Sequence, residues 1–223
     1  MGVRPVDLIE GEFYHVFNRG TDKRPIFQDR ADYSRFVRLL YISNTTKHIN
    51  VRNILRSHSG LFEYDLKERL VAIGVYCLMP NHFHILLTPL VDDGVSRFMK
   101  KLCTGYSMYF NKRYERTGTL FEGPFKASWA DNDNYLKYLY AYIHLNPMKL
   151  YTPRPEDRGS EESATDFLRS YQHSSLLDYL AMQRSESVIL TPERFPEYFS
   201  TAADHWAELR DWLTYDPHPH EEN

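Results

Sequence analysis

Apolar side chains recur along the chain with two different spacings, and each spacing predicts one kind of element. Alternation or a short continuous apolar run is typical of a strand, whereas a period between three and four is typical of a helix. Short apolar and aromatic runs predict strands at residues 13–18, 70–79, 82–88 and 125–130. Helical spacing predicts helices at residues 29–44, 95–114 and 135–145.

The order of these elements predicts the fold class. Strand, helix, strand, strand, helix, strand is the split βαβ, ferredoxin-like α+β arrangement: a four-stranded antiparallel sheet with helices on one face. The middle strands form a hairpin, because Pro80 cannot lie inside a sheet ladder. Residues 152–165 have the composition of a linker. We therefore predict a main domain over residues 1–150 and a small helical extension over 151–223.

Composition excludes several classes of protein. The chain has 223 residues, of which 26% are charged and 15% aromatic, and these fractions are ordinary for a globular protein. No apolar run approaches the ~20 residues of a membrane helix, and the N-terminal residues lack the apolar core of a signal peptide. Two cysteines cannot supply a disulfide framework or a zinc-finger ligand set. We expect a soluble, cytoplasmic protein without a membrane partner.

Charge is distributed unevenly, although the whole chain carries a formal net charge of −3. Residues 94–150 hold 9 Lys+Arg against 4 Asp+Glu, whereas residues 151–223 hold 6 against 15. The basic segment is also rich in tyrosine and phenylalanine. Cations interleaved with aromatic rings suit single-stranded nucleic acid, because phosphates pair with the cations and bases stack on the rings. A solvated helix face is the alternative interpretation of the charge alone.

His82 and His84 are the first candidates for chemistry. In a strand they point to the same face, with Phe83 on the other. Two neighbouring imidazoles are a natural pair of ligands for a divalent metal ion. His-x-His is common, however, and two structural histidines are the alternative. His15, in the first strand, is better interpreted as a structural sheet histidine than as a ligand.

The third helix supplies a phenol and an amide. Tyr142 and Asn146 are four residues apart and so lie on one helix face, one turn from each other. The Asn146 amide oxygen could be a third metal ligand beside the histidines, with the phenol next to the metal. Core packing is the alternative for a tyrosine at helical spacing. His144 points elsewhere on the helix, which suggests packing or a DNA contact rather than a catalytic base.

Three segments together resemble the REP-associated tyrosine transposases, of the HUH single-tyrosine transposase family. They are the hairpin YCLMPNHFHILLTP, the segment GTLFEGPFKA and the helix end YIHLNPMK. The opening YHVFNRG and the stretch YQHSS also resemble that group. The resemblance covers residues 12–150, with a weaker continuation to about residue 180.

The resemblance implies a mechanism. The family's histidine pair corresponds to His82 and His84, which with Asn146 would bind Mg²⁺ or Mn²⁺. The family's nucleophile corresponds to Tyr142, which would attack a DNA phosphodiester to give a 5′-phosphotyrosine and a free 3′-hydroxyl. The partner would be single-stranded DNA beside a hairpin or palindromic repeat, and the protein would work at the nucleoid. Relatives include monomers and dimers, so a homodimer is possible.

Basic residues predict where the DNA backbone runs. Lys126 corresponds to a lysine of the family, whereas Pro124 stands where the family has an arginine and removes one basic contact. Arg19 follows the first strand and is a further candidate for a phosphate contact. Five further basic residues lie on or after the second helix, and we expect them to contact DNA phosphates: Lys100, Lys101, Lys112, Arg113 and Arg116. Binding through such contacts weakens as the salt concentration rises.

Two other functions compete with a cutting enzyme. One is a non-cutting protein, domesticated from a transposase, that binds DNA hairpins. The other is a small-molecule metallohydrolase built on the histidine pair, which would leave the basic aromatic segment unexplained. The acidic extension could cover the sheet, limit access to the basic segment, or mediate association.

Overall fold

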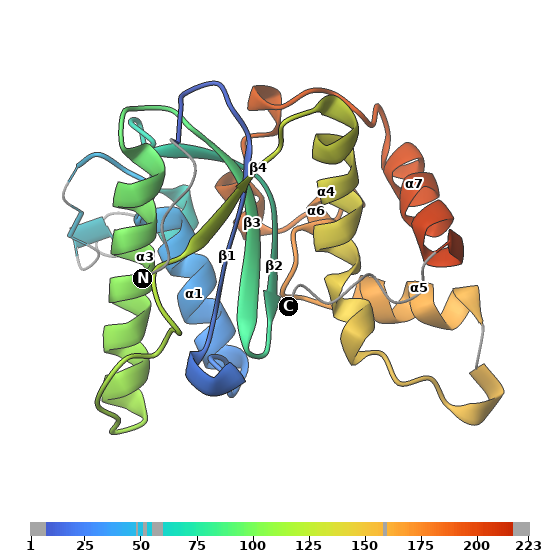
Figure 1. Cartoon of the computed structure of the whole chain (residues 1–223), viewed down its shortest axis with the longest axis horizontal. Helices are drawn as coiled ribbons and strands as arrows, with labels where there is room; N and C mark the ends of the chain where they lie inside the picture. The colour runs from blue at the N-terminus through green and yellow to red at the C-terminus, as the bar shows by residue number, and fades with distance from the viewer. Residues whose placement is uncertain (1–7, 48, 51–52, 55–59, 158–159, 216–223) are drawn as a thin grey trace.

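A four-stranded antiparallel sheet lies at the centre of the protein, in the order β2-β3-β1-β4 (Figure 1). The computed structural model describes residues 8–47, 49–50, 53–54, 60–157 and 160–215. The strands are β1 (Tyr14–Arg19), β2 (Val71–Met79), β3 (His82–Pro89) and β4 (Lys126–Trp129). The three long helices of the main domain are α1 (Arg30–Ile42), α3 (Gly94–Arg113) and α4 (Asp133–Leu145). The predicted α+β class, order of elements along the chain and four-stranded antiparallel sheet are confirmed, and each predicted boundary lies within two residues of the observed one.

The helices cover both faces of the sheet. On one face α1 and α3 pack Phe36 and Phe98 against strand residues such as Phe83. On the other face α4 packs Ile143 against residues such as Val75 of β2. The predicted placement of helices on one face therefore holds for α1 and α3 and fails for α4. All nine residues of β2 are buried, and a strand that is apolar on both sides requires cover on both faces.

The extension closes the free edge of β2. Ser175 N donates to Tyr76 O at 2.9 Å, and Ser175 Oγ accepts from Tyr76 N at the same distance. Further along the chain, Thr191 N donates to Ile73 O at 2.9 Å. The edge strand thus has partners that shield it from pairing with another chain.

The elements of the extension differ from the prediction. Residues 152–165 are not a plain linker, because α5 (Glu161–Ser170) begins within them. Helix α6 (Leu176–Tyr179) is only one turn long, and Ser175 before it bonds to β2. The last helix, α7 (Ala202–Tyr215), is present and lies on the far side of α4 from the sheet (Figure 1). Leu209 of α7 shares an apolar cluster with Leu145 of α4, so the extension covers α4.

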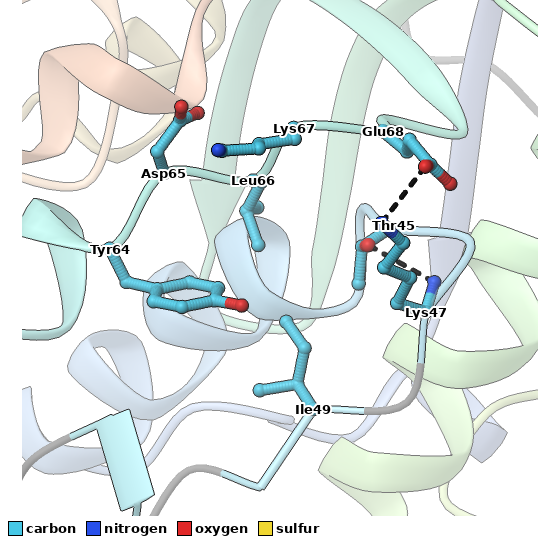
Figure 2. A pocket seen from close by; sticks show the side chains of 8 residues that line it. All are labelled: Thr45, Lys47, Ile49, Tyr64, Asp65, Leu66, Lys67 and Glu68. Atoms are coloured by element: carbon cyan, nitrogen blue, oxygen red, sulfur yellow. Dashed lines mark hydrogen bonds and ion pairs between the residues drawn. The ribbon is translucent and has the colours of Figure 1, made fainter.

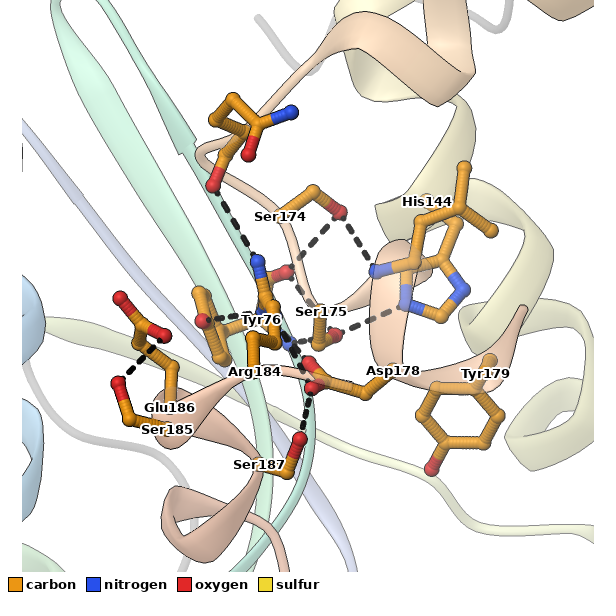
Figure 3. Close-up of polar contacts among 12 residues, drawn as sticks. Tyr76, His144, Ser174, Ser175, Asp178, Tyr179, Arg184, Ser185, Glu186 and Ser187 are labelled. Atoms are coloured by element: carbon orange, nitrogen blue, oxygen red, sulfur yellow. Dashed lines mark hydrogen bonds and ion pairs between the residues drawn. The ribbon is translucent and has the colours of Figure 1, made fainter. Parts of the chain in front are cut away.

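A buried polar network ties the extension to α4 and β2 (Figure 3). His144 is fully buried, with Nε2 2.9 Å from Ser175 Oγ and Nδ1 2.9 Å from His205 Nε2. Arg184 donates through Nη2 to both Asp178 Oδ2 and the Tyr76 hydroxyl, at 2.5 and 2.9 Å. His144 therefore has the packing role, not a DNA contact. Within the described part of the chain, no helix is long and apolar enough to cross a membrane.

Candidate active site

His82 and His84 lie at the beginning of the central strand β3 and share one face of the sheet. This is the face that α4 covers, because Phe83 between them belongs to the core under α1 and α3. His84 is only 3% exposed, and His82 is half-buried. The two rings lie edge to face, with centroids 4.9 Å apart. A pair of neighbouring imidazoles is thus held beside the β2–β3 turn.

Helix α4 brings a phenol and an amide to this pair. The helix begins at Asp133, and the side chain of Asn132 caps it by accepting a hydrogen bond from Tyr135 N at 2.9 Å. Tyr142 is 6% exposed, and its ring centroid lies 5.6 Å from that of His84. Asn146 is fully buried and donates through Nδ2 to Tyr142 O at 3.0 Å. The structure therefore brings together the four residues that the sequence singled out for chemistry.

Hydrogen bonds fix which nitrogen of each imidazole faces the site. His82 Nδ1 lies 2.6 Å from Asn81 Oδ1, and an amide oxygen only accepts, so His82 Nδ1 carries the proton. His84 Nδ1 lies 2.8 Å from His15 Nε2. With the Nδ1 side occupied in both rings, the Nε2 atoms remain for another ligand. His84 Nε2 is buried and makes no hydrogen bond with any residue that the structure describes, and the buried Asn146 side chain faces His82.

Burial keeps these imidazoles neutral. It lowers the pKa of His82 to about 4. The Lys149 ammonium lowers this pKa further, while a hydrogen bond with the Asn146 side chain raises it. Burial also lowers the pKa of His84 well below its usual range and that of His15 to about 3. Neutral imidazole is the form that coordinates metal, because a protonated nitrogen has no lone pair to donate. The pair is ready to bind a cation at neutral pH.

The donors present could hold a divalent metal ion, since imidazole nitrogens and amide oxygens both ligate metals in proteins. Over the described ranges, no three His, Cys, Asp or Glu side chains gather in a way that could hold a metal. The set is instead two imidazoles and one amide oxygen, His82, His84 and Asn146. Buried polar atoms without partners are rare in proteins and call for an explanation such as an ion. Three protein ligands would leave further positions for phosphate oxygens and water.

His15 would act as a positioning residue for a metal ion on His84, because its imidazole contacts His84 Nδ1 and leaves His84 Nε2 for the metal. We expect His15→Phe to weaken Mn²⁺ binding by about 10–100-fold, the usual cost of losing such a partner. His15→Gln should retain most of the affinity, since its amide oxygen can accept from His84 Nδ1. Calorimetric titration with Mn²⁺ measures both effects, and His173→Phe is the matched control. Equal affinities for wild type and His15→Phe would contradict the assignment.

Two of the predicted DNA-contacting residues lie beside the site. Arg19 pairs with His82 across the β1–β3 ladder, and Lys126 pairs with Phe17, a neighbour of His84, across the β1–β4 ladder. Glu122 joins the two cations, with its carboxylate oxygens 3.1 Å from Arg19 Nε and 3.4 Å from Lys126 Nζ.

The basic residues of α3 lie elsewhere. Helix α3 packs on the sheet face opposite the histidine pair, so contacts there would involve DNA that extends around the protein. Arg113 is held by carboxylate oxygens of Asp29 and Asp32 at 2.6 and 2.9 Å, and Lys101 Nζ donates to Thr45 O. Arg116 lies over a phenylalanine ring, and Lys100 and Lys112 are exposed. Their DNA contacts stay predictions.

A shallow pocket lies away from the histidine pair, between the end of α1 and the beginning of β2 (Figure 2). Its lining residues are Thr45, Lys47, Ile49, Tyr64, Asp65, Leu66, Lys67 and Glu68. Lys47 and Glu68 form an exposed ion pair across it at 2.9 Å. His82 pairs with Met79 at the opposite end of β2, so this pocket is separate from the candidate site.

Comparison with known proteins identifies the family. A family model described as "Transposase IS200 like" matches residues 14–146. The chain belongs to the IS200-like transposase family. The matched residues of this transposase include the histidine pair, Tyr142 and Asn146, and end at Asn146. Transposases cut and join DNA, so the family is one of DNA-processing enzymes.

A solved structure resembles this transposase over most of its length. It is described as "Structure of the REP associates tyrosine transposase bound to a REP hairpin", with a TM-score of 0.51 and 15% sequence identity. The match covers 83% of this chain and 90% of that one. At this identity the likeness shows the fold alone. A comparison with curated protein sequences gives no significant match.

Sequence analysis missed three residues of the site in this transposase. His15 was interpreted as a structural histidine, and only the β1–β3 register shows that it holds His84. Asn81 belongs to the hairpin motif, and only the structure shows that its side chain accepts from His82 Nδ1. Lys149 follows Asn146 by three residues, a spacing that places it just beyond the end of α4.

Proposed function

We propose that this transposase cuts and rejoins single-stranded DNA beside a hairpin, with Tyr142 as the nucleophile and His82, His84 and Asn146 as ligands of Mg²⁺ or Mn²⁺. One observation carries the proposal: the Tyr142 phenol lies against the imidazoles of His84 and His15, beside a buried nitrogen of His84 that makes no hydrogen bond with any described residue. The structural neighbour, which is bound to a REP hairpin, supports hairpin DNA as the partner. The protein would act at the nucleoid in the cytoplasm.

The reaction is a transesterification. The Tyr142 hydroxyl oxygen attacks the scissile phosphorus, and the bond from phosphorus to the 3′-oxygen breaks. The phenolic proton passes through solvent, and the leaving 3′-oxygen takes up a proton to become a free hydroxyl. The downstream fragment stays linked to Tyr142 through its 5′-phosphate. Attack on this phosphotyrosine by a second 3′-hydroxyl reverses the step. A bound metal ion supplies charge stabilisation at the phosphate oxygens.

The residues of the chain prepare this step by position. Tyr142 lies in a buried, pre-formed contact with the rings of His84 and His15, at centroid distances of 5.6 and 5.7 Å. A nucleophile held in place needs little reorganisation when the phosphate arrives. Arg19 and Lys126, linked through Glu122, lie on the same sheet face and would guide the neighbouring phosphates.

A denaturing gel tests the proposal directly. Labelled single-stranded DNA that carries imperfect hairpins from the source genome is incubated with the protein in Mn²⁺, Mg²⁺ or a chelator. We expect a covalent protein–DNA adduct with either metal, and none with the chelator, while hairpin binding in a native gel survives chelation. Binding without an adduct under either metal would favour the non-cutting hairpin-binding protein instead.

A further inference from the structure

Phe17 of β1 lies on the same face of the sheet as the histidine pair. It pairs with His84 of β3 on one side and with Lys126 of β4 on the other. Its ring is stacked on that of His15, with centroids 5.0 Å apart, and its centroid lies 6.0 Å from that of His84. The residue is half-buried. An apolar ring therefore lies beside the candidate metal ligands and remains in contact with solvent.

Core packing does not account for the Phe17 ring. Every other phenylalanine that the structure describes belongs to one of three apolar clusters, whereas Phe17 joins none of them. Helix α4 packs on this face against residues of β2 and β3, such as Val75 and Leu86, and the cluster contains no described residue of β1 or β4. The half of the face that holds Phe17 is thus outside the apolar contact with α4. Its position beside the candidate site, rather than its exposure alone, calls for a functional explanation.

The charges around Phe17 suit a single strand of DNA. Lys126 Nζ lies 5.8 Å from the centroid of the ring, and its side chain is exposed, so it can move aside for a base. Arg19 is the next residue of β1 on this face. Both cations bond Glu122, but a guanidinium and an ammonium each carry several N–H donors and can meet a phosphate as well. A ring between two cations binds single-stranded DNA well, because the base stacks while phosphates pair with the cations.

We propose that Phe17 stacks against a base of the single strand next to the scissile phosphate. This inference rests on the proposed strand cleavage at Tyr142 and names a further residue that binds the substrate. A phosphate held at His84 carries a nucleotide on each side, and a ring centroid 6.0 Å from that of His84 is within reach of the base of one of them. Every base has a π-face, so the contact positions the strand without selecting its sequence.

A double-mutant cycle between protein and DNA tests the contact. The probe is a labelled DNA hairpin with single-stranded flanks, in which one abasic nucleotide is moved along each flank position by position. Fluorescence anisotropy measures binding by wild type and by Phe17→Leu, which keeps an apolar side chain without a ring, in a chelator that prevents cleavage. We expect one abasic position to weaken wild-type binding by about tenfold, the size of a base–aromatic stack, and to weaken binding by Phe17→Leu by less than about twofold.

Two control variants, checked for folding by circular dichroism, separate stacking from a structural effect. Phe17→Tyr retains a ring and should show the wild-type penalty at the same abasic position. Phe13→Leu changes a half-buried phenylalanine just before β1, which packs against Phe195 with ring centroids 5.1 Å apart, and it should also behave as wild type. A merely structural role of Phe17 would weaken binding to intact and abasic DNA alike. An abasic penalty for Phe17→Leu equal to that of wild type at every position would therefore overturn the proposal.

The cycle gives a result whether or not the protein cuts. Where wild type forms the covalent adduct, the sensitive abasic position should adjoin the cleaved phosphate. A sensitive position elsewhere in the flanks would contradict the placement of Phe17 beside the reaction. If wild type binds the hairpin without forming an adduct, the proposed cleavage fails, and the cycle still decides whether Phe17 holds a base. The absence of any sensitive position for wild type would refute the stacking in either case.

Discussion

Tyr142→Phe should bind hairpin DNA as well as wild type and form no covalent adduct with it. The change removes only the hydroxyl oxygen that would attack phosphorus, and we expect adduct formation to fall by at least about 10³-fold. The phenyl ring retains the edge contacts with His15 and His84, so the site should keep its shape and its metal affinity. Denaturing gels measure the adduct, and fluorescence anisotropy measures binding.

The neighbouring tyrosine provides the control. Tyr138 lies one turn before Tyr142 on α4, with ring centroids 5.8 Å apart. Tyr138→Phe should form the adduct at the wild-type rate. An adduct that persists in Tyr142→Phe and disappears in Tyr138→Phe would show that Tyr138, not Tyr142, is the nucleophile.

Asp32→Ala should cause the largest loss of stability among the single substitutions considered. Asp32 is fully buried in α1, and its carboxylate accepts from the Arg113 guanidinium at 2.9 Å and from the Tyr109 and Tyr114 hydroxyls at 3.0 and 2.8 Å. Gln28 N donates to it at 2.8 Å. Removing the carboxylate leaves these donors without their acceptor and breaks the link between α1 and α3.

We expect the free energy of unfolding to fall by about 3 kcal/mol, toward the lower end for a broken buried ion pair because Arg113 is partly exposed. Urea denaturation followed by circular dichroism measures the change. Glu156→Ala, which removes an exposed ion pair with Arg154, is the control and should cost less than about 1 kcal/mol. A loss below 1 kcal/mol for Asp32→Ala would show that the network contributes little.

This network also engages one of the cations predicted to contact DNA, Arg113. From the sequence, Arg113 belongs to a basic segment and has no visible partner nearby. Asp29 and Asp32 are about eighty positions away in the chain, and only the packing of α1 against α3 brings them to it. Charge counted along a sequence therefore overestimates the cations available to a ligand.

Local spacing was enough to predict the elements and the core of the candidate site. The apolar periods fixed four strands and three long helices, because each period states which side chains share a face. The same geometry joins His82 with His84 in one strand and Tyr142 with Asn146 in one helix. These relations hold for any strand or helix and need no knowledge of the fold.

Contacts between distant segments could be decided only by the tertiary structure. The apolar residues of β2 show that both its faces are covered, but not that α4 covers one of them. The link from His15 to His84 depends on the register of β1 against β3, which the sequence leaves open. Ser175 and Thr191 were placed in a separate extension, yet they complete the edge of β2.

The sequence by itself determined the secondary structure, the family resemblance and the pairs of reactive side chains, since all of these depend on residues close together in the chain. The tertiary structure decided which pairs meet, which imidazole nitrogens face the site, and which cations remain near it. These properties depend on strand register and helix packing, where the free-energy differences come from many weak contacts between distant residues.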